Sequence, residues 1–229
     1  MISNLPMFVN IVFIFTTMLT VFLFYKATNR SLTALLIVIT WILVQMILGL
    51  KGFYLVTDTF PPRFILLAMP AVLFIVILFL LPGGRAFINT LDTKTLTILH
   101  IVRIPVELTL FWLFLDKSIP QIMTFEGRNF DILAGITAPL VYYFGYVKNY
   151  LNKAILMTWN MVCLVLLFNI VITAILSLPA PFQQFGFDQP NVAVLYFPFV
   201  WLPCCVVPLV LFAHLVTLRK LFMRTKTES

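Results

Sequence analysis

Long apolar stretches alternate with short polar segments along the whole chain of 229 residues. Several stretches lack Asp, Glu, Lys and Arg over about 20 residues, the length at which an α-helix crosses a bilayer core. The pattern predicts an all-α, polytopic membrane protein in which residues 1–229 form a single transmembrane domain. Seven transmembrane helices are expected, near residues 5–25, 32–50, 64–81, 96–115, 130–147, 154–177 and 192–217.

Polar residues just ahead of the apolar stretches predict where helices begin. Ser31, Asp92, Asn129 and Asn152 each precede such a stretch. Their side chains can accept hydrogen bonds from the unpaired N–H groups of a first helical turn. Asp131 then falls in the first turn of the fifth helix, where the helix dipole favours an anion.

The composition supports a membrane environment. Hydrophobic residues make up 62% of the chain and charged residues only 10%, whereas a soluble domain carries about 25% charged residues. Cys163, Cys204 and Cys205 all lie within apolar stretches and show no metal-binding spacing. We therefore expect neither a disulfide framework nor a metal site.

The distribution of basic residues predicts that the N-terminus lies outside and the C-terminus in the cytoplasm, because cytoplasmic loops are enriched in Lys and Arg. With this topology the inner segments hold ten Lys and Arg residues and the outer segments hold four. The net charge of +7 then reflects topology and contact with anionic lipid heads rather than nucleic acid. We expect a protein integral to a cellular membrane, either a bacterial inner membrane or a plasma membrane. The inner residues are Lys26, Arg30, Arg85, Lys94, Lys148, Lys153, Arg219, Lys220, Arg224 and Lys226; the outer ones are Lys51, Arg63, Lys117 and Arg128.

Proline residues lie inside several predicted helices. Each one lacks the N–H that a helix requires, so interruptions or kinks are expected at these positions. They are Pro70, Pro105 and Pro139, one to a helix, and Pro198, Pro203 and Pro208 in the seventh.

The fourth helix carries three ionisable residues, His100, Arg103 and Glu107. At 100° per residue they share one helix face, and Arg103 and Glu107 are one turn apart, so they can pair directly. We predict that both side chains face the bundle interior, within salt-bridge reach of each other or of a shared polar partner. Charges at membrane depth are costly and usually mark a functional site. The alternative is an ion pair that only fixes helix packing. Candidate supporting residues on other helices are Gln45, Tyr142, Asn160 and Asn169.

The outer loops near residues 116–129 and 178–191 are the longest. The segment from Phe125 to Asp131 holds three charged residues and an asparagine around one glycine. It is interpreted either as a small ordered cap or gate, or as an ordinary solvated turn. A parallel repeat of helices one to three in helices five to seven also stays open.

Three functional hypotheses follow. The first is a carrier or channel for a small solute or ion, built on the site of the fourth helix and on proline-bent helices. The second is a non-transporting membrane sensor or assembly partner, including a homo-oligomer. The third is a haem-binding or enzymatic membrane protein with His100 and His214 as haem ligands. We favour a non-enzymatic role without a cofactor, because no nucleotide-binding or hydrolase motif occurs in the sequence.

Overall fold

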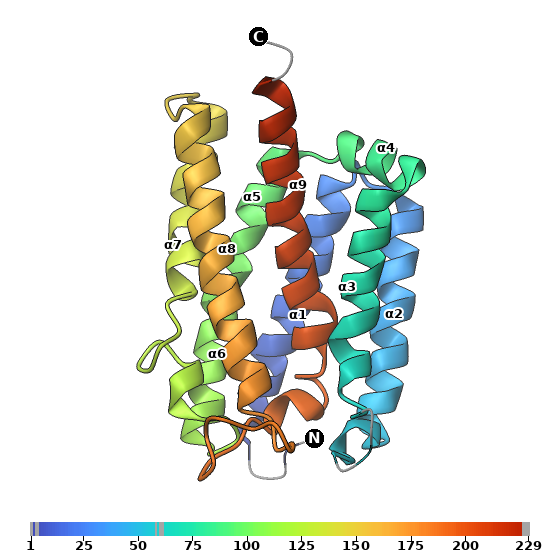
Figure 1. Cartoon of the computed structure of the whole chain (residues 1–229), viewed down its shortest axis with the longest axis vertical. Coiled ribbons are helices and arrows are strands. Elements are labelled where there is room, and N and C mark those ends of the chain that lie inside the picture. The colour runs from blue at the N-terminus through green and yellow to red at the C-terminus, as the bar shows by residue number, and fades with distance from the viewer. Residues whose placement is uncertain (1, 3–4, 58, 60–61, 226–229) are drawn as a thin grey trace.

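The computed structural model describes residues 2, 5–57, 59 and 62–225, with side chains to Met223. Helices make up 74% of it, and no strand occurs among the described residues. The long helices run roughly parallel to the long axis of the molecule, as Figure 1 shows. They are α1 (Met7–Ala27), α2 (Leu32–Leu50), α3 (Ile65–Leu80), α4 (Pro82–Thr90), α5 (Thr93–Leu99), α6 (Arg103–Leu115), α7 (Ile132–Val141), α8 (Lys153–Leu176) and α9 (Val207–Thr225).

Five helical segments are long and apolar enough to cross a membrane: α1, α2, Thr93–Leu115, α8 and Leu202–Met223. The bent pair α3 and α4, whose axes differ by 94°, makes a sixth if it counts as one span. The segment Ile132–Val147 is apolar but shorter. Large apolar side chains such as Phe15 (69% exposed) and Val165 (64% exposed) face outward. The all-α class is thus confirmed, and the apolar outer surface fits helices that are surrounded by lipid.

Three of the four predicted helix starts are confirmed. The side chains of Ser31, Asp92 and Asn152 cap α2, α5 and α8 by accepting backbone N–H groups of the first turn. Asn129 is not the N-cap of α7, a position that Asp131 occupies. Asn129 Oδ1 instead accepts the backbone N–H of Asp131 at 3.0 Å, so Asn129 fixes the entry of the chain into α7 without capping it.

The last helix begins later than predicted. Residues 196–200 form a bend and turns, and the π-helical segment Leu202–Val206 then leads into α9. Pro198 and Pro203 lie in these irregular parts, because neither has the N–H that a regular helix needs. The expected interruption is confirmed, whereas the predicted start near residue 192 is wrong.

The helix α3 continues through Pro70, so the interruption expected there does not occur. Since Pro70 has no N–H, the carbonyl of Leu66 lacks its helical donor. Gln45 Nε2 of α2 donates to that carbonyl at 3.3 Å and replaces the missing donor. Tyr54, in the turn after α2, donates its hydroxyl proton to Gln45 Oε1. Burial is the main reason why the pKa of Tyr54 is raised to about 12, so the phenol keeps this proton.

The α7 helix begins partway along the bundle rather than at its end (Figure 1). The preceding segment of residues 116–131 reaches this point with an exposed tip at Glu126 and Arg128. Thr124 and Asn129 in the same segment are fully buried. The part from Phe125 to Asp131 thus combines exposed side chains with the buried Asn129 and Asp131, and it brings polar groups into the interior.

Candidate functional site

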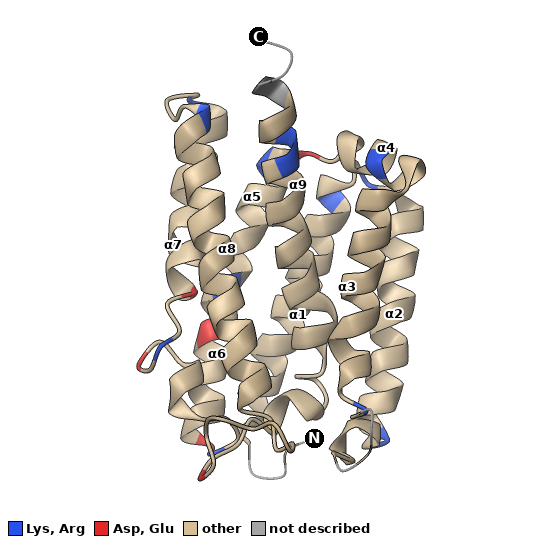
Figure 2. Ribbon diagram, in the orientation of Figure 1, with Lys and Arg blue, Asp and Glu red and all other residues tan. Residues whose placement is uncertain are grey.

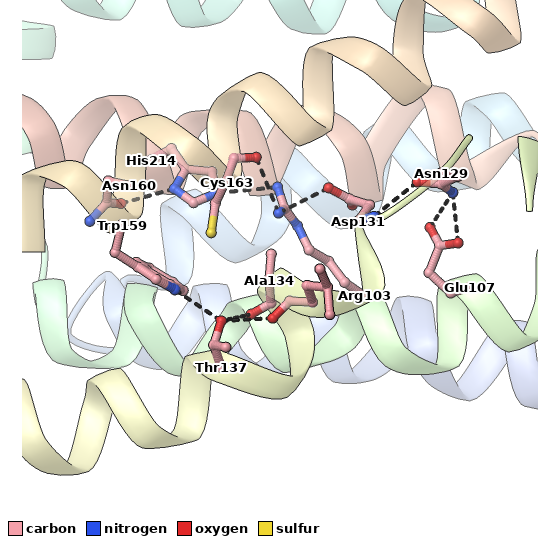
Figure 3. Close-up of polar contacts among 11 residues, drawn as sticks. Arg103, Glu107, Asn129, Asp131, Ala134, Thr137, Trp159, Asn160, Cys163 and His214 are labelled. Atoms are coloured by element: carbon pink, nitrogen blue, oxygen red, sulfur yellow. Dashed lines mark hydrogen bonds and ion pairs between the residues drawn. The ribbon is translucent and has the colours of Figure 1, made fainter. Parts of the chain in front are cut away.

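Polar side chains from four parts of the bundle meet in its interior, as Figure 3 shows for most of them. They come from the α5–α6 segment, from the start of α7, from α8 and from α9, and none is more than 4% exposed. We call them the polar cluster: His100, Arg103, Glu107, Asn129, Asp131, Asn160 and His214.

A local change of helix type precedes Arg103. Residues His100–Val102 form one 3₁₀ turn between α5 and α6. Pro105 accounts for this change, because it cannot donate to the carbonyl of Ile101 and its ring crowds the preceding turn. A 3₁₀ turn winds by 120° per residue instead of 100°. The relative directions of His100 and Arg103 therefore differ from those on an ideal α-helical wheel.

Gly135 allows α7 to approach α6 closely at Arg103. A Cβ atom at residue 135 would lie 2.8 Å from Ile104 Cγ1 and 3.2 Å from Arg103 Cβ. These distances are shorter than ordinary van der Waals contact, so a larger residue would push the helices apart. Asp131 lies one helical turn before Gly135, and the close approach brings it to Arg103.

Arg103 forms its ion pair with Asp131, at 3.1 Å between Nη1 and Oδ1. The same Nη1 atom donates to the carbonyl of Cys163 on α8 at 3.4 Å. Both Arg103 and Glu107 face the interior, as predicted, with 2% and 1% of their surfaces exposed. Of the two expected arrangements, the direct pair of Arg103 with Glu107 does not form, because among the described residues the salt-bridge partner of Arg103 is Asp131.

Glu107 is instead held by Asn129. Asn129 Nδ2 donates to both carboxylate oxygens of Glu107 at 2.6 Å and also to the carbonyl of Met123 at 3.0 Å. Through the contact of Asn129 Oδ1 with the N–H of Asp131, Glu107 is connected to the ion pair. The two carboxylates therefore belong to one network, joined by a residue of the loop between α6 and α7.

His214 extends the network to α8 and α9. Arg103 Nη2 lies 3.2 Å from His214 Nε2, and His214 Nδ1 lies 2.9 Å from Asn160 Oδ1. Because arginine only donates, Nε2 must accept, which leaves the proton of a neutral ring on Nδ1. That N–H then donates to Asn160, whose amide group donates to the carbonyl of Leu156 at 2.8 Å. The hydrogen bonds thus define one tautomer of His214.

His100 stacks on His214, with ring centroids 3.8 Å apart and an interplanar angle of 15°. Trp159 lies against both rings at 5.6 and 5.9 Å. Neither ring nitrogen of His100 has a hydrogen-bond partner among the described residues, although the side chain is fully buried. This stacking does not fit a haem iron between the two histidines, because the rings lie face to face and both nitrogens of His214 are engaged.

Of the supporting residues expected from the sequence, Asn160 joins the polar cluster and the other three lie elsewhere. Gln45 contacts Leu66 and Tyr54. Asn169 is exposed and donates to the carbonyl of Arg128 at 2.9 Å. Tyr142 is half-buried in the π-helical segment Tyr142–Val147, with no hydrogen bond to the cluster in the described part of the chain. Within the same part, no three His, Cys, Asp or Glu residues are placed to hold a metal ion.

A family model described as "Domain of unknown function (DUF8737)" matches residues 60–222, more than two thirds of the chain. The chain belongs to the DUF8737 family. The DUF8737 region contains every residue of the polar cluster, whereas α1 and α2 precede it. Comparisons with curated proteins and with solved structures gave no match.

Proposed function

We propose that this DUF8737 protein crosses a membrane seven times, with its N-terminus outside, and conducts protons through the bundle by way of the polar cluster. The cluster supports this proposal because it joins two carboxylates, an arginine and two imidazoles inside an apolar bundle. If Arg103 served only to fix helix packing through an ion pair, one carboxylate would be enough. The second carboxylate and the two histidines would then have no role.

The arrangement of the helices supports the seven-span topology. The five long helices, the bent pair α3–α4 and the shorter segment Ile132–Val147 are seven apolar units in chain order, a number that fits seven crossings. In Figure 2 most Lys and Arg residues lie at the end of the bundle where α9 ends. Basic residues favour the cytoplasmic side, so this end is assigned to the cytoplasm. Asp58 and Lys226, which also enter the charge pattern, lie outside the described residues.

This topology is tested by cysteine labelling in intact cells with a membrane-impermeant maleimide. Residues 148 and 188 are both exposed. The proposed topology places their loops on opposite sides of the membrane. We expect Asp188→Cys to react in intact cells and Lys148→Cys to react only after permeabilisation. The native cysteines are buried, and the unsubstituted protein measures their background. Labelling of residue 148 in intact cells would contradict the proposed topology.

The charges of the cluster support a bound, exchangeable proton. Arg103 contributes one positive charge, whereas Asp131 and Glu107 contribute two negative charges when both are ionised. His214 is neutral in the tautomer that its hydrogen bonds define. We take His100 as neutral too, because neither of its buried ring nitrogens has a hydrogen-bond partner among the described residues to stabilise a second N–H. An uncompensated charge at the bilayer centre costs roughly 2.5–3.5 kcal/mol on insertion scales. We therefore infer that the cluster holds one proton at rest, shared between its carboxylates.

The extent of the cluster supports a pathway along the membrane normal. His100 and Glu107 are seven residues apart, or about 10 Å along a helix, which is roughly a third of the bilayer core. At the outer end Glu107 contacts Asn129, which belongs to the loop of residues 116–131. At the inner end His214 contacts Asn160, one turn from Leu156 on α8. The unpartnered nitrogens of His100 offer a further position for the proton.

The proposal is tested by proton flux into proteoliposomes that contain a trapped pH-sensitive dye. A potassium gradient with valinomycin supplies the membrane potential. We expect a protein-dependent change of internal pH that protein-free vesicles of the same lipid composition do not show. Equal rates in both preparations, with folded protein recovered from the vesicles, would overturn proton conduction.

One observation favours a second candidate, a non-transporting sensor or assembly partner. A cavity of about 870 Å³ is lined mainly by residues of α2, α3 and α9, and none of its lining residues belongs to the polar cluster. Absence of proton flux together with stable retention of a second membrane protein on purification would favour this candidate.

A further inference from the structure

A groove opens on the side of the bundle between α2 and α3, away from the polar cluster. It has a volume of about 870 Å³, within the range of roughly 300–1,000 Å³ typical of sites for small ligands. We call it the lateral groove. Its walls include Ala34 and Ile37 of α2, Ala71 and Phe74 of α3, and Leu209 and Phe212 of α9.

The lateral groove exists because the inner half of α2 is poorly packed. The buried residues of α2 are Ile42, Gln45 and Gly49, all in its outer half. No residue from Leu32 to Trp41 is buried. Lipid-facing side chains are normal in a membrane helix, but here the space between two helices of the same bundle is also left open.

The back of the groove is fixed by a hydrogen bond across the bundle. Pro208 has no N–H, so the carbonyl of Cys204 lacks its helical donor. Trp41 Nε1 of α2 donates to that carbonyl at 2.9 Å. The indole of Trp41 lines the groove, and its only donor is engaged. The lining therefore presents apolar surface even where polar residue types occur.

The dimensions match one leaflet of a bilayer. The lining residues of α2 extend from Ser31 to Val44, which is about 20 Å along a helix. One leaflet, with its headgroup region, accounts for about half of the bilayer thickness of roughly 40–45 Å. The groove thus extends from the membrane surface to about the midplane, the path of a lipid acyl chain.

Two exposed basic residues lie close in sequence to residues at the inner end of the groove. Ser31 and Phe87 line this end, and Arg30 and Arg85 lie one and two residues from them, both exposed. Phe87 and Arg85 belong to α4, which turns 94° away from α3 and lies across the end of α2 and α3 in Figure 1. The nearby acid Asp92 is occupied in capping α5. The arginines are thus available to an anionic headgroup at the membrane surface.

We propose that the lateral groove binds an anionic phospholipid, with one acyl chain between α2 and α3 and the headgroup at Arg30 and Arg85. The apolar lining, the length of the groove and the charges at its end each fit this ligand. A helix of a partner protein would fit the apolar walls, but it would not account for basic residues at the inner end.

Trp41 supplies a direct probe for this proposal. The full-length protein is reconstituted in phosphatidylcholine vesicles that contain brominated phosphatidylglycerol or, at equal mole fraction, brominated phosphatidylcholine. Brominated chains quench tryptophan on contact, and the difference between wild type and Trp41→Phe isolates the signal of Trp41. We expect brominated phosphatidylglycerol to quench Trp41 with a higher apparent affinity than brominated phosphatidylcholine. Each arginine should contribute roughly fivefold to this difference in apparent affinity.

Substitutions separate the chain site from the headgroup site. Arg30→Gln/Arg85→Gln changes only exposed residues and should abolish the preference for phosphatidylglycerol while chain quenching persists. Lys148→Gln, a basic residue of another inner loop, should leave the preference unchanged. Ala34→Leu/Ala71→Leu should reduce quenching by both lipids.

Two results in the wild type would overturn the proposal. Equal quenching of Trp41 by both lipids would show that the groove holds bulk lipid only. Absence of quenching would indicate that a protein segment fills the groove.

Discussion

Arg103→Met is expected to destabilise the protein by about 3–5 kcal/mol, because it leaves the buried carboxylate of Asp131 without its counter-charge. Asp131→Asn should cost a similar amount by leaving the guanidinium unpaired. The double variant should cost less than the sum of the two single variants, since neither charge then remains. The coupling follows from the contact of 3.1 Å between the two side chains and from their burial.

The measurement is a double-mutant cycle on unfolding in mild detergent with increasing SDS. A second cycle with Arg103→Met and Glu107→Gln is the matched control, because Glu107 is held by Asn129 rather than by Arg103. We expect the larger coupling energy in the first cycle. Additive effects for Arg103 and Asp131 together with strong coupling to Glu107 would show that the ion pair is the one expected from sequence spacing.

Glu107→Gln is expected to reduce proton flux in proteoliposomes by roughly a hundredfold, the low end of the usual contribution of a positioned proton-transfer group. The glutamine retains the shape of the side chain and can still accept a hydrogen bond from Asn129 Nδ2. It cannot release or accept a proton. The amide nitrogen of the glutamine replaces one of the two oxygens that accept from Asn129 Nδ2, so stability in detergent should fall by about 1 kcal/mol. This small loss separates loss of conduction from loss of fold.

Glu126→Gln is the matched control for this substitution, because Glu126 lies at the exposed tip of the same outer loop. Its flux should equal that of the wild type. If Glu107→Gln conducts as well as wild type, Glu107 has no part in proton transfer and the network serves helix packing.

Much of the helical architecture could be predicted from local sequence features. Apolar stretches and capping residues such as Ser31 and Asn152 act within a few residues of the helix that they define. The proline residues were harder to interpret, because their effect depends on distant donors. Pro70 is accommodated within α3 since Gln45, on another helix, supplies the missing hydrogen bond.

The burial of Arg103 and Glu107 could be predicted from the cost of exposing charges to lipid, but their partners could not. A helical wheel assumes regular winding, and the 3₁₀ turn before Arg103 breaks that assumption. Asp131 reaches Arg103 because the outer loop enters the bundle, and His214 is 111 residues away in the chain. One sequence feature pointed to these partners. Asn129 and Asp131, an amide and an acid, lie directly before an unusually short apolar stretch.

The shortness of this stretch also affects the surrounding bilayer. The segment from Ile132 to Val147 comprises ten α-helical and six π-helical residues, so it extends at most about 24 Å, less than a bilayer core of roughly 30 Å. Lipid next to α7 must become thinner, or the exposed Phe130 and its loop must enter the acyl region. The helix α3, with 16 residues, is equally short, so on the proposed topology hydrophobic mismatch arises at both helices. The protein should then be more stable in bilayers of short-chain lipids than in thick ones.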